Sequence, residues 1–240
     1  MKKHIVFITV FILLGHVTVA PAGYFDTLFK AFNTSSENRV DTDNVAAGLK
    51  EALKIGTSRA VNSLGKVNGF FGNNAVKILM PEKMQIMANI LSQAGFKSQV
   101  DAFILSMNRA AEKAVPEAVP LFVDAIKHMT ISDAVKILKG GDTAATEYFR
   151  AKTASNLYKK LRPVVTSHIN SVGVTRTYND MMKAYNALPF TKQVSFDLND
   201  YVTDKTLNGL FYMVGQEEKR IRKDPAARVT GLLKTVFGTN

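Results

Sequence analysis

Apolar residues recur along most of the chain at intervals of three or four, which is the spacing of one face of an α-helix. Gly48 and Gly56 lie on roughly one face of the run 41–64 and indicate close packing against another helix. The alternation typical of strands is not sustained, although 75–80 and 193–196 are candidates for short extended pieces. The pattern predicts an all-α fold with about nine or ten helices of ordinary length.

Glycines and prolines mark where these helices should end. Gly95 and the pair Gly140-Gly141 are expected stops, because glycine readily adopts the left-handed backbone conformation that ends a helix. Pro163 should separate two helices, because an interior proline removes a hydrogen bond and clashes with the preceding turn. We expect residues 41–240 to form a single compact multi-helix domain.

The first 22 residues have the pattern of a secretory signal peptide. Lys2 and Lys3 precede an apolar run at 5–14, and a small-x-small cleavage site ends at Ala22. The apolar run falls short of the roughly 20 residues that a membrane span needs. We therefore expect cleavage after Ala22 and a soluble mature protein, which would be periplasmic in a Gram-negative source.

Residues 23–40 read as an amphipathic segment followed by a linker. Apolar side chains recur there at helical spacing, at Phe25, Leu28, Phe29 and Phe32. The next stretch, 33–39, is polar and turn-rich. We expect the segment to dock on the main domain, with contact to a membrane as the alternative.

The amino-acid composition excludes several kinds of site and of covalent modification. The chain has no cysteine, which excludes disulfides, thiolate zinc sites, cysteine nucleophiles and a lipidated N-terminus. Its formal charge is +11, and many cations stand at predicted helix ends, where they oppose the negative end of the helix dipole. A solvated basic surface is the expected reading, and peripheral contact with an anionic membrane surface is the alternative. Nucleic acid is not expected, because basic and aromatic residues do not interleave.

Several ordered segments carry a resemblance to a known family. They are AGLKEAL at 47–53, VKILMP at 76–81, MNRAAEKAVPEA at 107–118, MTISDAVKIL at 129–138, GGDTAATEYF at 140–149 and DYVTDKTLNGLFYMVGQEEKRIRKDPAARVTGLLKTVFG at 200–238. From about residue 41 onward the chain resembles the bacterial exported family known as domain of unknown function 4197. The resemblance implies an all-helical exported protein and assigns no activity. The resemblance also implies a family in which many members are lipoproteins, whereas this chain lacks the lipobox cysteine.

The run 140–148 is the most site-like motif. Two glycines before a helix can present free backbone N–H groups to an anion, and the helix dipole adds to that attraction. Asp142, however, can cap the same donors and would repel an anion, so a helix stop followed by an N-cap is the expected use. The run contains neither the Walker lysine nor a dinucleotide fingerprint, and no cofactor is predicted.

A second polar group lies on the helix expected over 98–115. Arg109 and Glu112 stand at i, i+3 spacing, next to Asn108. Across a helix interface they could meet polar residues of 142–147 in a buried network, which would be either structural or part of a binding pocket. The candidate binding residues are Asn108, Arg109, Glu112, Asp142, Thr143, Thr146 and Glu147.

Two further pairs have i, i+4 spacing. Asp124 and His128 suit a hydrogen-bonded pair better than a metal site, and no metal is predicted. Glu218 and Arg222 are expected on a solvated face, and they become binding candidates if that face proves buried. No catalytic residue is assigned.

These patterns favour a non-catalytic envelope protein that binds a partner protein or small ligand in a cleft between helices, with 107–149 as one wall. A carrier of an apolar or lipid-like ligand is an alternative, suggested by nine methionines and fifteen phenylalanines. A hydrolase-type enzyme that uses the clustered acids Glu112, Asp142 and Glu147 is another.

Overall fold

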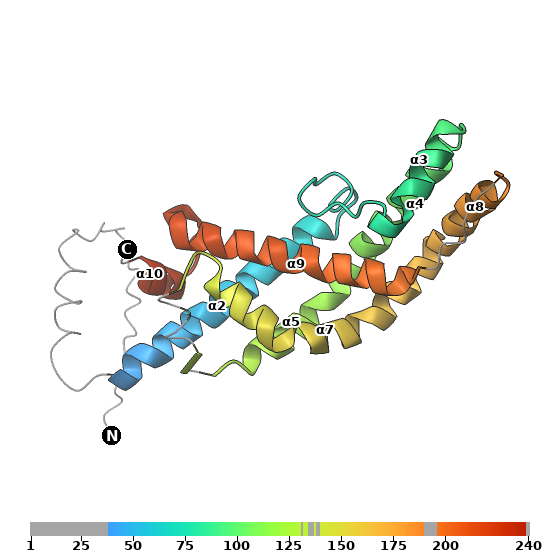
Figure 1. Ribbon diagram of the computed structural model, residues 1–240. Helices are drawn as coiled ribbons and strands as arrows, with labels where there is room; N and C mark the ends of the chain where they lie inside the picture. The colour runs from blue at the N-terminus through green and yellow to red at the C-terminus, as the bar shows by residue number, and fades with distance from the viewer. Residues whose placement is uncertain (1–37, 131, 134–136, 138–139, 190–195, 239–240) are drawn as a thin grey trace, which may run out of the picture. The chain divides into compact units, whose positions relative to one another are not determined.

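The computed structural model describes residues 38–130, 132–133, 137, 140–189 and 196–238, and every regular element in them is helical (Figure 1). The α-helices are α2 (Asn38–Leu64), α3 (Gln85–Gln93), α4 (Lys97–Ala114), α5 (Val119–Lys127), α7 (Ala144–Ser171), α8 (Val174–Asn186), α9 (Leu198–Lys223) and α10 (Gly231–Phe237). Short 3-10 helices span Glu82–Met84, Val115–Ala118 and Pro225–Ala227. The all-α prediction is confirmed, and the signal peptide, the amphipathic segment 23–32 and its linker lie outside the described residues.

Two helices were expected on either side of Pro163, but α7 runs through this proline without a break. A proline inside a helix costs about 3 kcal/mol. Buried apolar side chains continue on one face of α7 on both sides of it, at Leu157, Leu161, Val165 and Ile169. Burial of this face offsets the local cost, so tertiary packing overrides the expected break.

Neither expected extended piece forms a described strand. Residues 77–80 are irregular, and 193–195 lie outside the described residues. Among the described residues, no helix is both long enough and apolar enough to cross a membrane.

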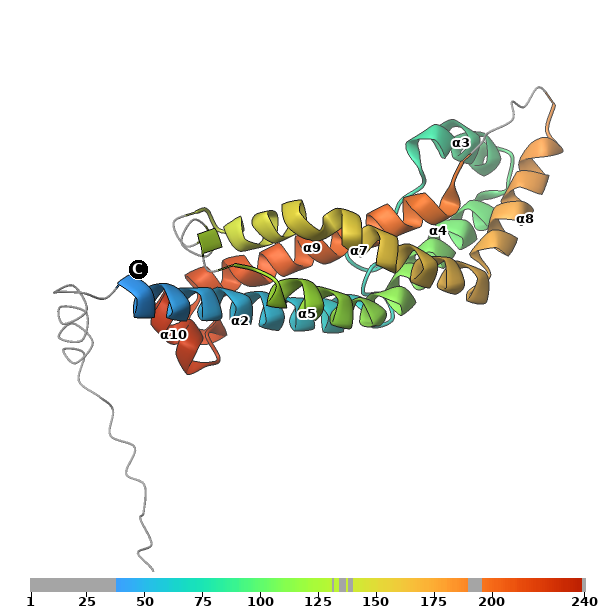
Figure 2. The ribbon, with the colours of Figure 1, turned by 90° about the horizontal axis from the view of Figure 1, so that it is seen from below.

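The centre of the helical assembly is an aromatic cluster. Phe122 of α5, Phe149 of α7 and Phe211 of α9 are fully or almost fully buried, and their ring centroids are 5.3–6.1 Å apart. Helices α7 and α9 lie side by side, as Figure 1 and Figure 2 both show. The cluster therefore joins three helices that are distant in sequence.

Helix α2 packs on α9 at Gly56 and on α10 at Gly48, and only at Gly48 would a Cβ atom clash. A Cβ atom at Gly56 would lie 3.4 Å from Glu217 Cβ and 3.6 Å from the Val214 carbonyl oxygen, so α2 packs directly on α9 there. A Cβ atom at Gly48 would lie 2.5 Å from Val236 of α10. The predicted close packing at both glycines is confirmed, and it fixes the position of α2 beside α9 and α10.

Candidate functional site

The polar group on α4 holds the α2–α3 loop, residues 65–81. Asn108 is completely buried, and its side chain bonds both backbone groups of Ile78. Its Oδ1 accepts from the Ile78 N–H at 2.8 Å, and its Nδ2 donates to the Ile78 carbonyl at 2.8 Å. The amide thus imitates a strand partner for an irregular segment, which explains why this loop runs through the core without unpaired backbone groups at Ile78.

Glu112 performs the same task one turn further along α4. Its side chain is 4% exposed, and its Oε1 accepts from the N–H groups of Phe70 and Phe71, both at 3.1 Å. Arg109 neutralises it with an Nη1 to Oε2 contact of 2.6 Å and donates from Nη2 to Asn68. Asn108, Arg109 and Glu112 are therefore occupied by the loop.

The N-terminus of α7 is capped by a carboxylate from α9. Glu218 accepts from the N–H of Ala145 at 3.0 Å and from the N–H and hydroxyl of Thr146 at 2.8 and 2.7 Å. Its Oε1 also accepts from Arg222 Nε at 2.9 Å. The side chains of Glu218 and Arg222 are only 2% and 11% exposed, so the expectation that this pair lies on a solvated face is wrong.

This arrangement corrects the reading of the Gly140-Gly141 run. The cap residue is Thr143, and its side chain makes no capping bond. Asp142 faces outward instead and pairs with Lys223 at 2.6 Å. A protein carboxylate already takes the N–H groups that an anion would need, because the dipole that attracts a ligand attracts Glu218 equally.

The two groups of predicted site residues do not meet. Among the described residues no hydrogen bond or ion pair joins Asn108, Arg109 or Glu112 to the start of α7. There, the Thr143 hydroxyl donates to Glu147 at 2.6 Å, and the hydrogen bond from Lys223 lowers the pKa of Asp142. The three acids of the enzyme hypothesis thus each have a local donor, and the structure does not place them around one cleft.

His128 bonds the main chain and not the Asp124 side chain. Its Nδ1 lies 2.8 Å from the Asp124 carbonyl oxygen, and the Asp124 carboxylate lies 3.6 Å from Lys160 Nζ. The described residues contain no cluster of three or more histidine or acidic side chains that could hold a metal ion.

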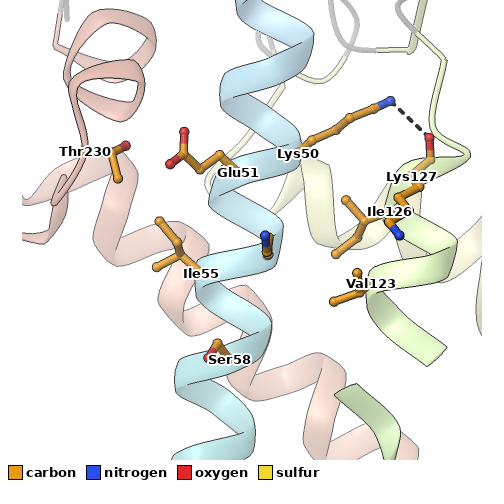
Figure 3. A pocket seen from close by; sticks show the side chains of 9 residues that line it. Lys50, Glu51, Ile55, Ser58, Val123, Ile126, Lys127 and Thr230 are labelled. Atoms are coloured by element: carbon orange, nitrogen blue, oxygen red, sulfur yellow. Dashed lines mark hydrogen bonds between the residues drawn. The ribbon is translucent and has the colours of Figure 1, made fainter. Parts of the chain in front are cut away.

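A groove lies over α2 and α5 (Figure 3), and we call it the α2–α5 groove. Its volume is about 660 Å³, within the range of about 300–1,000 Å³ typical of small-ligand sites. Its described lining is Lys50, Glu51, Lys54, Ile55, Ser58, Val123, Ile126, Lys127 and Thr230. Three of these residues are lysines and one is an acid, around three branched aliphatic side chains.

The lysines are not distributed evenly around the groove. Lys50 points toward α5 and donates to the Lys127 carbonyl at 3.2 Å, whereas Glu51 points toward Thr230 (Figure 3). The Lys50 ammonium therefore sits at the C-terminus of α5, where the helix dipole favours a cation. Neither Lys54 nor Lys127 forms an ion pair with a described acid. The α5 side of the groove is thus its positive side.

The predicted wall 107–149 contributes Val123, Ile126 and Lys127, but none of the seven named candidate residues lines this groove. The sequence of α2 does show a row of polar residues on its outer face, because Lys50, Lys54 and Ser58 follow one another at intervals of four. Nothing local in that repeat indicates that α5 will stand beside it.

A second groove, of about 500 Å³, lies between α7 and α9. One of its charged groups, Arg150, bonds Asn208 and stacks on Phe211, with its Cζ 5.4 Å from the ring centroid. At its rim the Tyr158 hydroxyl donates to Asp200 at 2.7 Å. Burial, and then this bond, raise the pKa of Tyr158 to about 12. This groove is smaller than the α2–α5 groove, and Arg150 and Tyr158 of its lining already have partners.

The fold and the groove define an all-helical protein with a basic surface site. The chain belongs to the family described as protein of unknown function (DUF4197), whose model matches residues 39–238. No curated protein and no solved structure matches the chain.

Proposed function

We propose that this chain is a non-catalytic periplasmic protein that binds a ligand, or a segment of a partner protein, in the α2–α5 groove. The observation that carries the proposal is the lining of the groove, in which lysines surround Ile55, Val123 and Ile126. Ligand sites combine a mostly apolar surface with a few polar groups that fix orientation, and this lining has that composition. The pattern of residues 1–22 supports the periplasmic location.

Binding is better supported than hydrolysis. The acids that a hydrolase would need are engaged: Glu112 by two backbone N–H groups and Arg109, and Asp142 by Lys223. A general acid or base must reach the proton it transfers. Carboxylates that hold a loop or pair with lysine are positioned for structure, and they give the enzyme alternative no support.

Native mass spectrometry of the protein purified from its own envelope fraction tests the proposal. We expect an adduct on the wild-type protein that is lost in Ile55→Glu, because a carboxylate in the apolar part of the groove opposes binding. Val67→Glu is the matched control, since Val67 is 73% exposed and lies outside the groove. A bare wild-type mass, or an adduct retained by Ile55→Glu, contradicts the proposal.

The periplasmic location has its own test. Fractionation should place the protein in the periplasm, and its N-terminal sequence should begin at Gly23. An uncleaved cytoplasmic protein would refute this part of the proposal.

A further inference from the structure

We infer that the α2–α5 groove takes a single-chain anionic amphiphile, an acyl chain of medium length with one carboxylate at its end. This inference rests on the proposed function and names the class of ligand. It follows from the separation of charge and apolar surface within the groove.

The positive side of the groove provides the site for the carboxylate. The ammonium of Lys50 is held in place by the Lys127 carbonyl, and the Lys127 side chain belongs to the same rim. The nearest acid on α5, Asp124, lies against Lys160 on α7. The ammonium groups of the rim are therefore available to an external anion, and one anion can satisfy more than one of them.

The apolar part of the groove provides the site for the chain. Ile55 projects from α2 and Val123 from α5, and both are only half-buried, so a ligand can still cover them (Figure 3). Ile126 also lines the groove, but it is only 5% exposed and adds little surface to it. Removing apolar surface from water favours binding in proportion to its area.

Glu51 favours one orientation of the ligand in the groove. It lies on the Thr230 side of α2, away from Lys127 (Figure 3). A carboxylate placed beside Glu51 would meet a like charge, whereas one placed beside Lys50 and Lys127 meets two cations. The head group is therefore expected beside the ammonium groups of Lys50 and Lys127, with the chain running between Ile55 and Val123 toward Ser58.

The dimensions favour one chain of medium length. From Lys50 to Ser58 the helix rises roughly 12 Å at 1.5 Å per residue. A ligand of that length fits the volume of about 660 Å³, and the apolar lining consists of only three side chains, Ile55, Val123 and Ile126. This geometry favours a monomeric amphiphile over the surface of a bilayer.

Isothermal titration calorimetry with the mature protein tests the inference. The ligands are decanoate, uncharged decyl glucoside and acetate, each below its micelle concentration, followed by anionic phosphatidylglycerol vesicles. We expect decanoate to bind with one-to-one stoichiometry, and decyl glucoside and acetate to bind about tenfold more weakly or not at all, since each lacks half of the ligand. Added salt should weaken decanoate binding, because its head group pairs with exposed lysines.

Variants locate the site. The triple substitution Lys50→Gln, Lys54→Gln, Lys127→Gln should weaken decanoate binding about tenfold, the change expected when several exposed charge contacts of modest strength are lost together. The corresponding arginine triple variant, which keeps the charges, should retain binding. Lys183→Gln is the control, because Lys183 is exposed on α8, away from the groove. Circular dichroism should give the same melting temperature for all of these variants.

Two results overturn the inference: no binding of monomeric decanoate, whether or not vesicles bind, or equal binding of decanoate by the glutamine triple variant. If the envelope-derived adduct is lost in Ile55→Glu while decanoate does not bind, the binding function stands and the assigned ligand class is wrong. If neither is seen, both are wrong.

Discussion

The sharpest test of the fold concerns Glu218, whose carboxylate joins α9 to the first turn of α7. Glu218→Ala removes three hydrogen bonds at Ala145 and Thr146, and it leaves the Arg222 guanidinium, 11% exposed, without its acid. Deleting one partner of a buried ion pair costs about 3–5 kcal/mol, because the remaining charge stays desolvated. We expect a loss of this size in the free energy of unfolding.

Chemical denaturation measures this loss, and the same substitution at the neighbouring Glu217 provides the comparison. Glu217→Ala removes ion pairs to Arg59 and Arg220 that are longer and more exposed, so it should cost about 1 kcal/mol or less. Combining Glu218→Ala with Arg222→Met should recover part of the stability, since it also removes the unpaired charge. Amide exchange at Ala145 and Thr146 should accelerate in Glu218→Ala. A loss below about 1 kcal/mol, or one equal to that of Glu217→Ala, would refute the capping role.

Three further predictions concern single contacts in the fold. Asn108→Ala should reduce the free energy of unfolding by about 2–4 kcal/mol in denaturant melts, because it leaves a buried backbone N–H and C=O unpaired; an unchanged midpoint would contradict it. Gly209→Ala should cost about 1–3 kcal/mol, since the new Cβ would lie 2.7 Å from the Phe70 ring, and wild-type stability would show that the ring moves freely. Tyr158 should ionise near pH 12 in a spectroscopic titration, and Asp200→Asn should bring the pKa of Tyr158 closer to 10. The pKa of Tyr158 is higher in the folded than in the unfolded protein. The contribution of Tyr158 to stability is therefore complete below pH 10 and is lost as the pH rises toward 12. A Tyr158 pKa of 10 would refute the buried hydrogen bond.

Local signals predicted several element boundaries. Gly95, an expected stop, has a φ angle of +89° after α3, and Gly173 has the same left-handed conformation, with φ +76°, after α7. Helix α4 stops at Ala114, just before Pro116, as the proline rule predicts. These boundaries were predictable because a few neighbouring residues decide them.

The candidate site was predictable only in part. The sequence identified the polar residues that prove to be buried on α4, but their partners are remote: Glu112 bonds Phe70, and Glu218 bonds Ala145, 73 positions away. The i, i+4 spacing of Glu218 and Arg222 was visible, whereas their burial was not. A spacing rule gives the neighbours on one helix and says nothing about the element that covers them.

The sequence by itself therefore determined the helical class, the approximate helix boundaries and the presence of buried polar residues, because each follows from the period of apolar residues or from the backbone preference of one residue. The tertiary structure decided that α7 continues through Pro163, that Glu218 caps α7, and that α2 and α5 form a groove. Each of these depends on surfaces that meet only after folding. Burial of one face of α7 outweighs the local preference of Pro163, and folding brings together residues whose local sequence does not show that they are neighbours.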